Sequence, residues 1–380
     1  MPRKKLTMNV FEAAIDRMVK VYEQGHRVVV SFSGGKDSGA SLEVCILAAQ
    51  ATNRLPVDVI CRDEEIMYPG TYEYVLRTAQ RPEVNMHWIY ACQPIINIFN
   101  RKAPYFWVFD PKLPPEQWVR QPPDIAYRVE EQNIEHMTIP KRFPVAKGKE
   151  LFAVIGLRVS ESRGRLYGLF SSKGYLTQPN KYGTRGCRPI YDWGDGDIWK
   201  AHNDMKWDYN DAYNTMHRLG VKRASLRIAP PTMNAASVDH LWVASTAWPQ
   251  WFDRVCQRCP GVRTAAQFGK RSVLPERRLD ETWEAAFHRL CIEESPDWIK
   301  ERSTNLRDKI LRGHRHHAAT PFPDVTPCYT CKSNIGSWRA MSLAMYNGDP
   351  FSMKQDYLPF VEPELFRPGA GTWGGRPSFS

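Results

Sequence analysis

Near the N-terminus, a β-branched segment, a double glycine and a helix-forming segment follow one another directly. Arg27 to Ser31 reads Arg-Val-Val-Val-Ser, Gly34 and Gly35 come next, and Ser38 to Ala51 is rich in Ala, Leu, Glu and Ile. Consecutive β-branched residues bounded by a turn indicate a strand buried on both faces, and the residues after the glycines favour a helix. A buried strand that leads through a tight turn into a helix restricts the chain to α/β folds.

The same alternation continues along the first half of the chain. Apolar periodicity predicts further strands at residues 57–61, 85–91 and 151–157, and further helices at residues 10–24 and 69–80. Strands that alternate with helices predict an α/β fold with a parallel twisted sheet and helices on both faces. Ligands of such sheets bind at the carboxyl ends of the strands, which is where the two glycines are expected to lie.

Two changes in composition divide the chain. Cys92 to Glu150 is rich in proline and aromatic residues, which predicts an irregular insertion that serves either as a structural cover or as a substrate lid. From about Leu226 the alternation ends, and Trp, Arg and paired Cys become frequent. We expect a sheet domain over residues 1–225, a mostly helical, cysteine-containing domain over 226–365, and a flexible tail over 366–380.

The charge and the apolar content limit the class of protein. The 380 residues contain 42% hydrophobic and 24% charged residues, and no apolar run reaches membrane-spanning length. The basic N-terminus lacks the apolar segment of a secretory signal, so we expect a soluble, cytoplasmic protein. A net charge of +11 predicts an anionic partner such as a nucleotide, a nucleic acid or sulfate. The basic clusters lack the aromatic interleaving of RNA-binding modules, so nucleic-acid binding stays an open alternative.

The double-glycine loop has the chemistry of an anion site. It is not the common P-loop, which needs four residues between its first glycine and the Gly-Lys pair. A strand that runs into a helix through glycines directs backbone N–H groups and the positive end of the helix dipole at one point. Asp37 can cap the helix or hold Mg²⁺. The residues expected to bind the anion with backbone or side-chain groups are Ser31, Ser33, Gly34, Gly35, Lys36, Asp37 and Ser38.

Four motifs in order resemble one enzyme family. Ser33-Gly34-Gly35-Lys36-Asp37-Ser38 resembles the signature loop of the PP-loop ATP pyrophosphatases, which cleave ATP between the α- and β-phosphates or bind adenylylated substrates. Three later segments resemble motifs of the phosphoadenosine phosphosulfate (PAPS) reductase branch of that superfamily. These segments are Arg62 to Thr71, Gly156 to Arg165, and Arg188 to Trp199.

The resemblance implies an adenine nucleotide alpha hydrolase-like fold that binds ATP or PAPS with Mg²⁺. Arg158 and Arg165 have the bidentate geometry that suits phosphate or sulfate oxygens, and Glu161 can orient one of them. Asp63 can bind the ribose, Mg²⁺ or a substrate amine. The family's Thr-Gly is replaced by Glu64 and Glu65, for which exposure to solvent is the simplest expectation. The predicted catalytic residues are Lys36, Asp37, Arg158 and Arg165.

One departure from the family concerns the reductase chemistry. PAPS reductases carry a nucleophilic cysteine in a C-terminal Glu-Cys-Gly-x-His segment, and this string is absent from the sequence. Cys187 lies between Arg185 and Arg188, which would lower its pKa and make it a candidate sulfur carrier. A small cysteine buried in the core is the alternative. Conventional PAPS reduction is therefore not expected.

Two Cys-x-x-Cys pairs have the internal spacing of thiolate metal ligands. They are Cys256 with Cys259, and Cys328 with Cys331, separated by a long segment. We expect the four thiolates to bind Zn²⁺ or a [4Fe-4S] cluster. Three histidines lie between the pairs and can replace a ligand, although exposure is the simpler expectation for them. These histidines are His314, His316 and His317.

The favoured function is an ATP pyrophosphatase that forms an adenylate on an acceptor for later sulfur transfer. Nucleic acid is the candidate acceptor, as in the related DNA phosphorothioation proteins or in tRNA thiolation. A PAPS- or APS-binding reductase with an atypical cysteine is one alternative. Segments around Leu219 to Pro230 and Leu241 to Val255 also resemble PAPS-reductase-like proteins of mobile elements, including the immunoglobulin-binding regulator A type that is encoded beside a ParB-like partner. This resemblance implies a second alternative, a non-catalytic nucleotide-binding subunit of a mobile-element or defence system.

Overall fold

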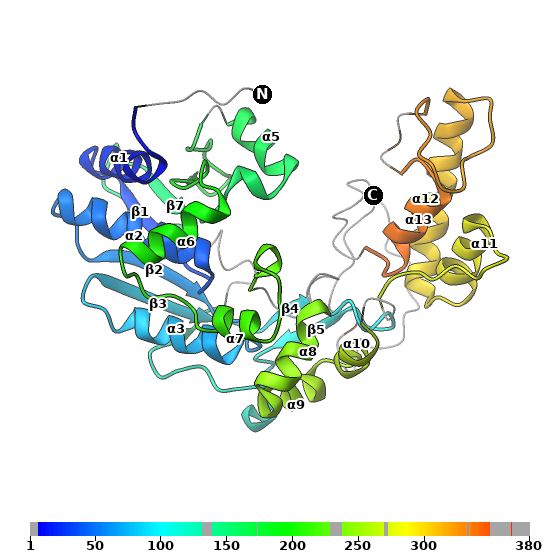
Figure 1. Cartoon of the computed structure of the whole chain (residues 1–380), viewed down its shortest axis with the longest axis horizontal. Coiled ribbons are helices and arrows are strands. Elements are labelled where there is room, and N and C mark those ends of the chain that lie inside the picture. Colours follow the sequence, from blue (N-terminus) through cyan, green and yellow to red (C-terminus); the bar gives the residue numbers. More distant parts are fainter. Residues whose placement is uncertain are drawn as a thin grey trace. The chain divides into compact units, whose positions relative to one another are not determined.

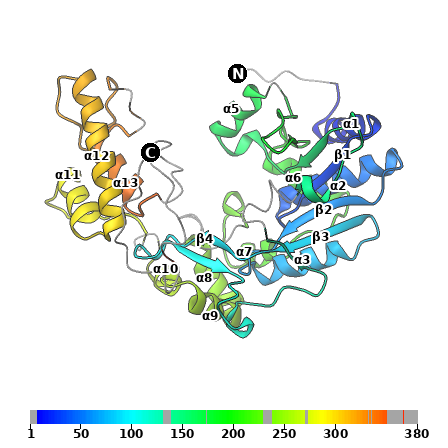
Figure 2. The ribbon, with the colours of Figure 1, turned by 180° about the vertical axis from the view of Figure 1, so that it is seen from behind.

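The computed structural model consists of two compact units (Figures 1 and 2). The first unit contains residues 1–93 and 109–228, and the second contains residues 94–108 and 229–380. The structure describes residues 7–130, 139–172, 174–228, 238–269, 273–331, 333, 335–349 and 366.

The first unit is built on a six-stranded sheet in the order β6-β3-β2-β1-β7-β8, in which every neighbouring pair is parallel. The strands are β1 (Arg27–Ser31), β2 (Val57–Arg62), β3 (Val84–Tyr90), β6 (Tyr127–Arg128), β7 (Leu151–Val154) and β8 (Thr184–Cys187). The parallel α/β sheet predicted from the sequence is confirmed. The strands with long β-branched or apolar runs lie where the sequence predicts them, within one to three residues at each end.

Side chains of β1 alternate between two buried clusters, one on each face of the sheet. Val28 and Val30 pack into the first cluster, and Val29 packs into the second. Helices α1, α2, α3 and α6 contribute to the first cluster, and the helical segment 139–142 contributes to the second through Ile139. Both faces are therefore covered, which explains why this strand is apolar without interruption. The helices of this unit are α1 (Val10–Glu23), α2 (Lys36–Ala51), α3 (Pro69–Ala79), α5 (Arg163–Ser171), α6 (Asp195–Asp204) and α7 (Ala212–Arg218).

The strand order reverses at β1. The chain proceeds from β1 to β2 and β3 on one side, and later places β7 and β8 on the other side. Val30 pairs with Val154 of β7, and Ser31 pairs with Ile60 of β2, so the carboxyl ends of these three strands lie next to one another. Open parallel sheets bind ligands at such reversal points, because the loops after the two flanking strands diverge there.

The proline-rich segment Cys92–Glu150 contains more regular structure than its composition indicates. Strands β4 (Gln93–Ile96) and β5 (Tyr105–Val108) form a separate two-stranded sheet, a 3₁₀ turn spans Pro115–Gln117, and β6 adds an edge strand to the main sheet. Residues 131–138 of this segment lie outside the described residues.

The described C-terminal region is helical, as the sequence predicts. Its elements are α8 (Val238–Ala247), α9 (Pro249–Arg258), α10 (Val262–Phe268), α11 (Trp283–Phe287), a π-helical segment (His288–Glu293), α12 (Asp297–His317) and α13 (Trp338–Met345). Phe287, Leu306 and Trp338 belong to a buried cluster shared by α11, α12 and α13. The predicted tail 366–380 lies outside the described residues apart from Phe366. In the part of the chain that is described, no helix has both the length and the apolar character needed to cross a membrane.

Candidate functional site

The loop between β1 and α2 has a backbone conformation at Gly34 that strongly favours glycine. Gly34 has a φ of +70°, in the left-handed region that side chains disfavour. A Cβ atom on Gly34 would lie 2.8 Å from Thr71 Cγ2 and 3.0 Å from Val75 Cγ2, both on α3. The chain therefore turns tightly against α3 before it enters α2.

Two serine hydroxyls close the loop on itself. The Ser33 backbone N–H donates to Ser38 Oγ at 3.3 Å, and the two serine hydroxyl oxygens lie 3.1 Å apart. Ser38 Oγ donates in turn to the Gly35 carbonyl oxygen at 3.0 Å. Ser33 is exposed, whereas Ser31 is the last residue of β1 and lies in the sheet beside Ile60. The hydroxyl groups of Ser33 and Ser38 thus lie together in the loop, and Ser31 ends the strand that precedes it.

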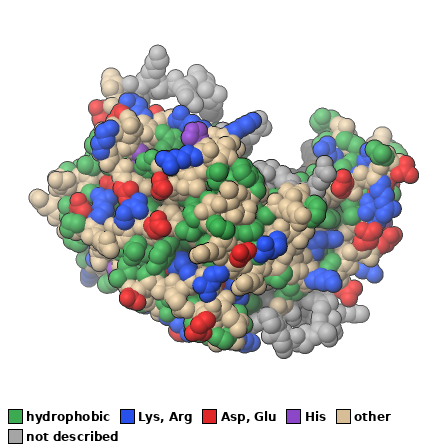
Figure 3. All heavy atoms as spheres, turned by 60° about the horizontal axis from the view of Figure 1, so that its bottom comes forward, with side chains coloured by type: hydrophobic (Ala, Val, Ile, Leu, Met, Phe, Trp, Pro, Cys, Tyr) green, Lys and Arg blue, Asp and Glu red, His purple; other side chains and the backbone are tan. Residues whose placement is uncertain are grey.

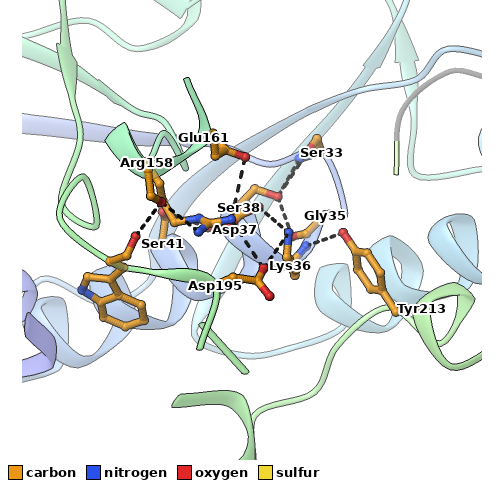
Figure 4. A network of polar contacts seen from close by, with 12 residues as sticks. Ser33, Gly35, Lys36, Asp37, Ser38, Ser41, Arg158, Glu161, Asp195 and Tyr213 are labelled. Carbon is orange, nitrogen blue, oxygen red and sulfur yellow. Dashed lines mark hydrogen bonds and ion pairs between the residues drawn. The ribbon is translucent and has the colours of Figure 1, made fainter. Parts of the chain in front are cut away.

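Lys36 begins α2 and is almost completely buried, with 5% of its surface exposed. Its Nζ donates to Asp37 Oδ2 at 3.1 Å and lies 3.8 Å from Asp195 Oδ1 at the start of α6 (Figure 4). The first turn of a helix leaves N–H groups without intrahelical partners and carries the positive end of the helix dipole. The positive charge of the buried Lys36 ammonium group and the positive end of the α2 dipole therefore lie in the same place.

Arg158 reaches this point from the loop after β7. Its Nε donates to Asp37 Oδ1 at 2.6 Å, and its terminal nitrogen lies 3.7 Å from Asp195 and 3.8 Å from Glu161. Gly156 permits the approach, because a Cβ there would lie 2.6 Å from the carbonyl carbon of Asp37. The two predicted cations Lys36 and Arg158 are thus brought together around shared carboxylates, as Figure 4 shows.

Arg165 lies at the edge of the same network. It forms an ion pair with Glu161, one turn before it in the chain, and its backbone N–H is capped by the Ser162 hydroxyl at 3.2 Å. Partial burial lowers the pKa of Arg165, and the neighbouring charges of Arg227 and Arg158 lower it further. A cation near other cations in a partly buried position is stabilised by an anion, and the Glu161 carboxylate is its partner here.

Asp63 and Glu65, which follow β2, are buried, and protein donors satisfy their carboxylates. Asp63 is fully buried, and its carboxylate accepts from Trp88 Nε1 at 3.0 Å and from the Glu65 N–H at 2.9 Å, and pairs with Arg120. Glu65 is also fully buried, which corrects the expectation that it is exposed to solvent. Its two carboxylate oxygens accept from the N–H groups of Phe109 and Val119 at 2.5 and 2.9 Å. Buried backbone donors need partners, and this carboxylate satisfies two of them.

Several residues that the sequence did not identify hold the loop in place. The Tyr213 hydroxyl accepts from the Lys36 N–H at 2.9 Å, and Asn210 Nδ2 donates to the Gly34 carbonyl oxygen at 2.8 Å. His202 Nε2 lies 3.2 Å from the Lys36 carbonyl oxygen, and burial lowers the pKa of this histidine. Asp195 contributes the third carboxylate near the cations. All four lie between residues 195 and 213, so only the folded chain brings them to the loop.

Cys187 is not an activated thiol. It is completely buried at the end of β8, and burial raises its pKa to about 12 even though Arg17, Arg185 and Arg188 act in the opposite direction. The expectation of a lowered pKa is wrong because removal of the thiolate from water outweighs the nearby charges. The alternative, a small core cysteine, is the arrangement that the structure has.

The two Cys-x-x-Cys pairs do not come together among the described residues. Cys328 and Cys331 lie with His314, and a ligand atom of each lies within 4.8 Å of the other two. No group of three or more candidate ligands in the described part of the chain includes Cys256 or Cys259. The nearby backbone N–H groups of Cys331 and Thr330 lower the pKa of the Cys328 thiol to about 7.

The surface charge is distributed rather than concentrated on the face drawn in Figure 3. Lys and Arg side chains form several small groups there, interspersed with Asp, Glu and hydrophobic side chains. The net charge of +11 therefore does not form one continuous basic surface in this view.

Comparisons with known proteins give distant similarities. No protein-family model matches the chain. The uncharacterized protein YbdN of Escherichia coli (strain K12) is 24% identical over 381 residues, which cover 93% of this chain and 92% of YbdN. The crystal structure of Candida glabrata FMN adenylyltransferase aligns with a TM-score of 0.36 and 12% identity, over 55% of this chain and 62% of that chain. This chain therefore spans about three fifths of the adenylyltransferase.

A second solved structure, the PAPS reductase of Candida auris in complex with phosphate, aligns with a TM-score of 0.29 and 13% identity, over 60% of this chain and 98% of that chain. Similarities this low transfer no activity.

Proposed function

We propose that the first unit binds an adenine nucleotide at the β1–α2 loop and cleaves ATP between its α- and β-phosphates to form an adenylate on an acceptor. One observation carries the proposal. A glycine turn at the strand-order reversal directs a helix N-terminus, the buried Lys36 and Arg158 from the loop after β7 toward one point. This arrangement supplies backbone donors and fixed positive charge, which is what a phosphate group requires.

The roles of the charged residues differ. Lys36 supplies a point charge to a phosphate oxygen in the proposed complex. Arg158 already donates to Asp37 and, at 3.3 Å, to the Ser160 hydroxyl, so it acts first as a positioning residue for the Asp37 carboxylate. Arg165, half-buried at the rim, would contact a phosphate oxygen in the proposed complex. Charge that is arranged before the reaction costs no reorganisation when negative charge moves onto the leaving group.

The carboxylates of the site fit Mg²⁺. Asp37 and Asp195 both lie within 4 Å of Lys36 Nζ, and both keep part of their surface exposed. Mg²⁺ takes one or two carboxylates together with phosphate oxygens and waters, and these two residues are the ones that would hold it. When bound, the ion would neutralise charge on the phosphates.

The proposed reaction is a substitution at the α-phosphorus. An acceptor oxygen forms a bond to that phosphorus, the bond between the phosphorus and the α–β bridging oxygen breaks, and pyrophosphate leaves with the electron pair. A sulfur nucleophile can later displace AMP from the acceptor. Nucleic acid is the acceptor to test first because the chain is strongly basic, and a ParB-like protein is the partner that the mobile-element resemblance implies.

Incubation with α-³²P-ATP and Mg²⁺, with and without DNA or RNA, tests the proposal. We expect release of pyrophosphate and label on AMP or on the acceptor. Lys36→Ala should reduce this turnover about 100-fold or more, because loss of one preorganised charge-stabilising group has that effect. Lys200→Ala is the matched control, since Lys200 is 74% exposed on α6 and pairs only with Asp204 among the described residues.

Two outcomes separate the alternatives. Binding of ATP without turnover of ATP or PAPS would support a non-catalytic nucleotide-binding subunit. Sulfite release from PAPS would support a reductase, but the buried Cys187 does not supply the accessible thiol that such a reaction needs.

A further inference from the structure

The second unit contains a cluster of metal-binding side chains at the C-terminal end of α12. His314 lies in the last turn of that helix, and Cys328 and Cys331 lie in the loop that leads to α13. We infer that these three side chains bind one Zn²⁺ ion, which fastens the loop of residues 318–337 to α12. This site is independent of the nucleotide site proposed above.

The hydrogen bonds of His314 define which ring nitrogen can bind a metal. Nε2 lies 2.7 Å from the carbonyl oxygen of Thr320, and because a carbonyl only accepts, Nε2 carries the hydrogen. Nδ1 then carries the lone pair of the neutral ring. That nitrogen is buried and has no hydrogen-bond partner, in a residue that is only 3% exposed. A zinc-binding histidine has this arrangement, in which one nitrogen binds the metal and the other donates to a carbonyl.

The two cysteines are held in a turn that brings their sulfurs to the same side. Cys331 Sγ lies 3.9 Å from the Cys328 carbonyl oxygen, to which it donates, so the two residues are joined across one turn of the chain. The Cys328 backbone N–H donates to the Gly336 carbonyl oxygen at 2.8 Å, and a Cβ on Gly336 would lie 2.9 Å from the Cys328 nitrogen. These contacts fix the backbone that carries the two sulfurs, and contacts outside the ligand set help to orient metal ligands.

The donor set and its dimensions select zinc. Two thiolates and an imidazole are the ligands that Zn²⁺ takes in a tetrahedral arrangement, with bonds of about 2.0 to 2.3 Å. Such bonds place ligand atoms roughly 3.5 to 3.8 Å apart. The ligand atoms here lie within 4.8 Å of one another, so a contraction of at most about 1.3 Å brings them to bonding positions. Cys328 is only half-buried, so a water molecule can complete the coordination.

The location of the cluster explains what the ion would contribute. The hydrophobic core shared by α11, α12 and α13 is small, and the loop between α12 and α13 contains no helix or strand among its described residues. Phe322 of this loop packs edge-on against the His314 ring, with centroids 5.1 Å apart. A metal ion bound to both α12 and the loop would hold them together and stabilise this part of the fold, as structural zinc ions do in other small units.

Metal analysis of the full-length protein, produced without a histidine tag in zinc-supplemented medium, tests the site. We expect one zinc per chain in the wild type, and less than about one tenth of that in Cys328→Ser, Cys331→Ser and His314→Gln, since a structural zinc site with a ligand removed binds far more weakly. His317→Gln is the matched control, because His317 is an exposed histidine on the same helix. It should retain the full zinc content.

Two further measurements test the site even if a variant that lacks one of the proposed zinc ligands does not fold. Chelation of the wild-type protein should lower its thermal unfolding temperature, and Zn²⁺ added back should restore it. After replacement by Co²⁺, the visible spectrum should show tetrahedral coordination with thiolate charge-transfer bands. Loss of zinc from the Cys256→Ser/Cys259→Ser double variant would instead indicate a four-cysteine site and overturn the inference. Iron in place of zinc, or wild-type protein that binds no Zn²⁺, would overturn it as well.

Discussion

The loops after β1 and β2 leave the same edge of the sheet as neighbours, yet they use charge in opposite ways. The loop after β1 gathers cations around partly exposed carboxylates, with Lys36 and Arg158 buried behind Asp37. The loop after β2 buries the carboxylates of Asp63 and Glu65 completely and binds them to fixed donors. Charged residues at the carboxyl end of a strand therefore serve the proposed ligand in one loop and the fold in the other. The difference lies in whether a protein partner already satisfies each polar atom.

The largest effect is expected for Gly34→Ala in the loop after β1. The left-handed φ costs about 1–2 kcal/mol and the clash with Thr71 and Val75 about 1–3 kcal/mol, so the free energy of unfolding should fall by about 2–5 kcal/mol. Nucleotide binding should be lost as well. Urea unfolding measures the first effect and calorimetry measures the second.

Gly148→Ala separates strain from the clash. Gly148 has a φ of +77°, and nothing lies within 4 Å of the position of its Cβ. The free energy of unfolding of this variant should fall only by the cost of the left-handed backbone conformation, about 1–2 kcal/mol. Equal losses in the two variants would show that the close approach to α3 does not shape the loop.

Arg158→Ala tests the cation that stands between the carboxylates. Without it, Asp37, Glu161 and Asp195 lose a shared partner, and an anionic nucleotide meets uncompensated negative charge. Loss of one partner of a buried charge pair costs about 2 kcal/mol or more, so ATP should bind at least about 30-fold more weakly. Arg77→Ala is the control, because Arg77 forms a half-exposed ion pair with Asp208. The Arg77→Ala variant should bind ATP as tightly as the wild type does.

Glu65→Gln tests the loop after β2. An amide cannot accept from both the Phe109 and Val119 N–H groups, because its nitrogen is itself a donor. The free energy of unfolding should fall by about 1.5–3 kcal/mol, while ATP affinity stays unchanged. Exposed Glu73→Gln should alter neither quantity. A weaker ATP affinity with normal stability in Glu65→Gln would remove the distinction between the two loops.

The smallest effect is expected at the end of another strand, β8. Cys187→Ala should keep full ATP turnover and lose about 1 kcal/mol of stability, the usual cost of a modest core substitution. The raised pKa, about 12, keeps this thiol protonated below that pH, so alkylation of the native protein at this position should not accelerate between pH 7 and pH 9. Mass spectrometry of alkylated peptides measures the rate. Rapid labelling at pH 7 would contradict the buried, protonated thiol.

The sequence predicted those parts of the fold that local composition determines. Strands β1 and β7 have continuous apolar or β-branched residues, and β2 and β3 are mostly apolar with a few polar residues, so their positions could be predicted. Strand β8 reads Thr-Arg-Gly-Cys and β6 contains only two residues, so neither has a local signal. Their strand conformation comes from pairing with β7 and β3.

The candidate site shows the same division. The loop residues from Ser33 to Ser38 were evident because glycine, lysine and serine types directly report anion chemistry. Tyr213 and Asn210 were not, because an isolated tyrosine or asparagine has many roles and acquires this one only through contacts about 175 residues distant in the chain. The pKa of Cys187 could not be predicted either, since neighbouring arginines are visible in the sequence and burial is not.

The contact between Gly156 and the first turn of α2 has a consequence for the order of assembly. The first turn of α2 contacts the backbone of Gly156, about 120 residues later in the chain. A fragment that ends before β7 would contain every residue of the glycine loop but would lack the surface that sets its position. We therefore expect the loop to reach its final form only after β7 has paired with β1, so that the proposed anion site would form late in folding.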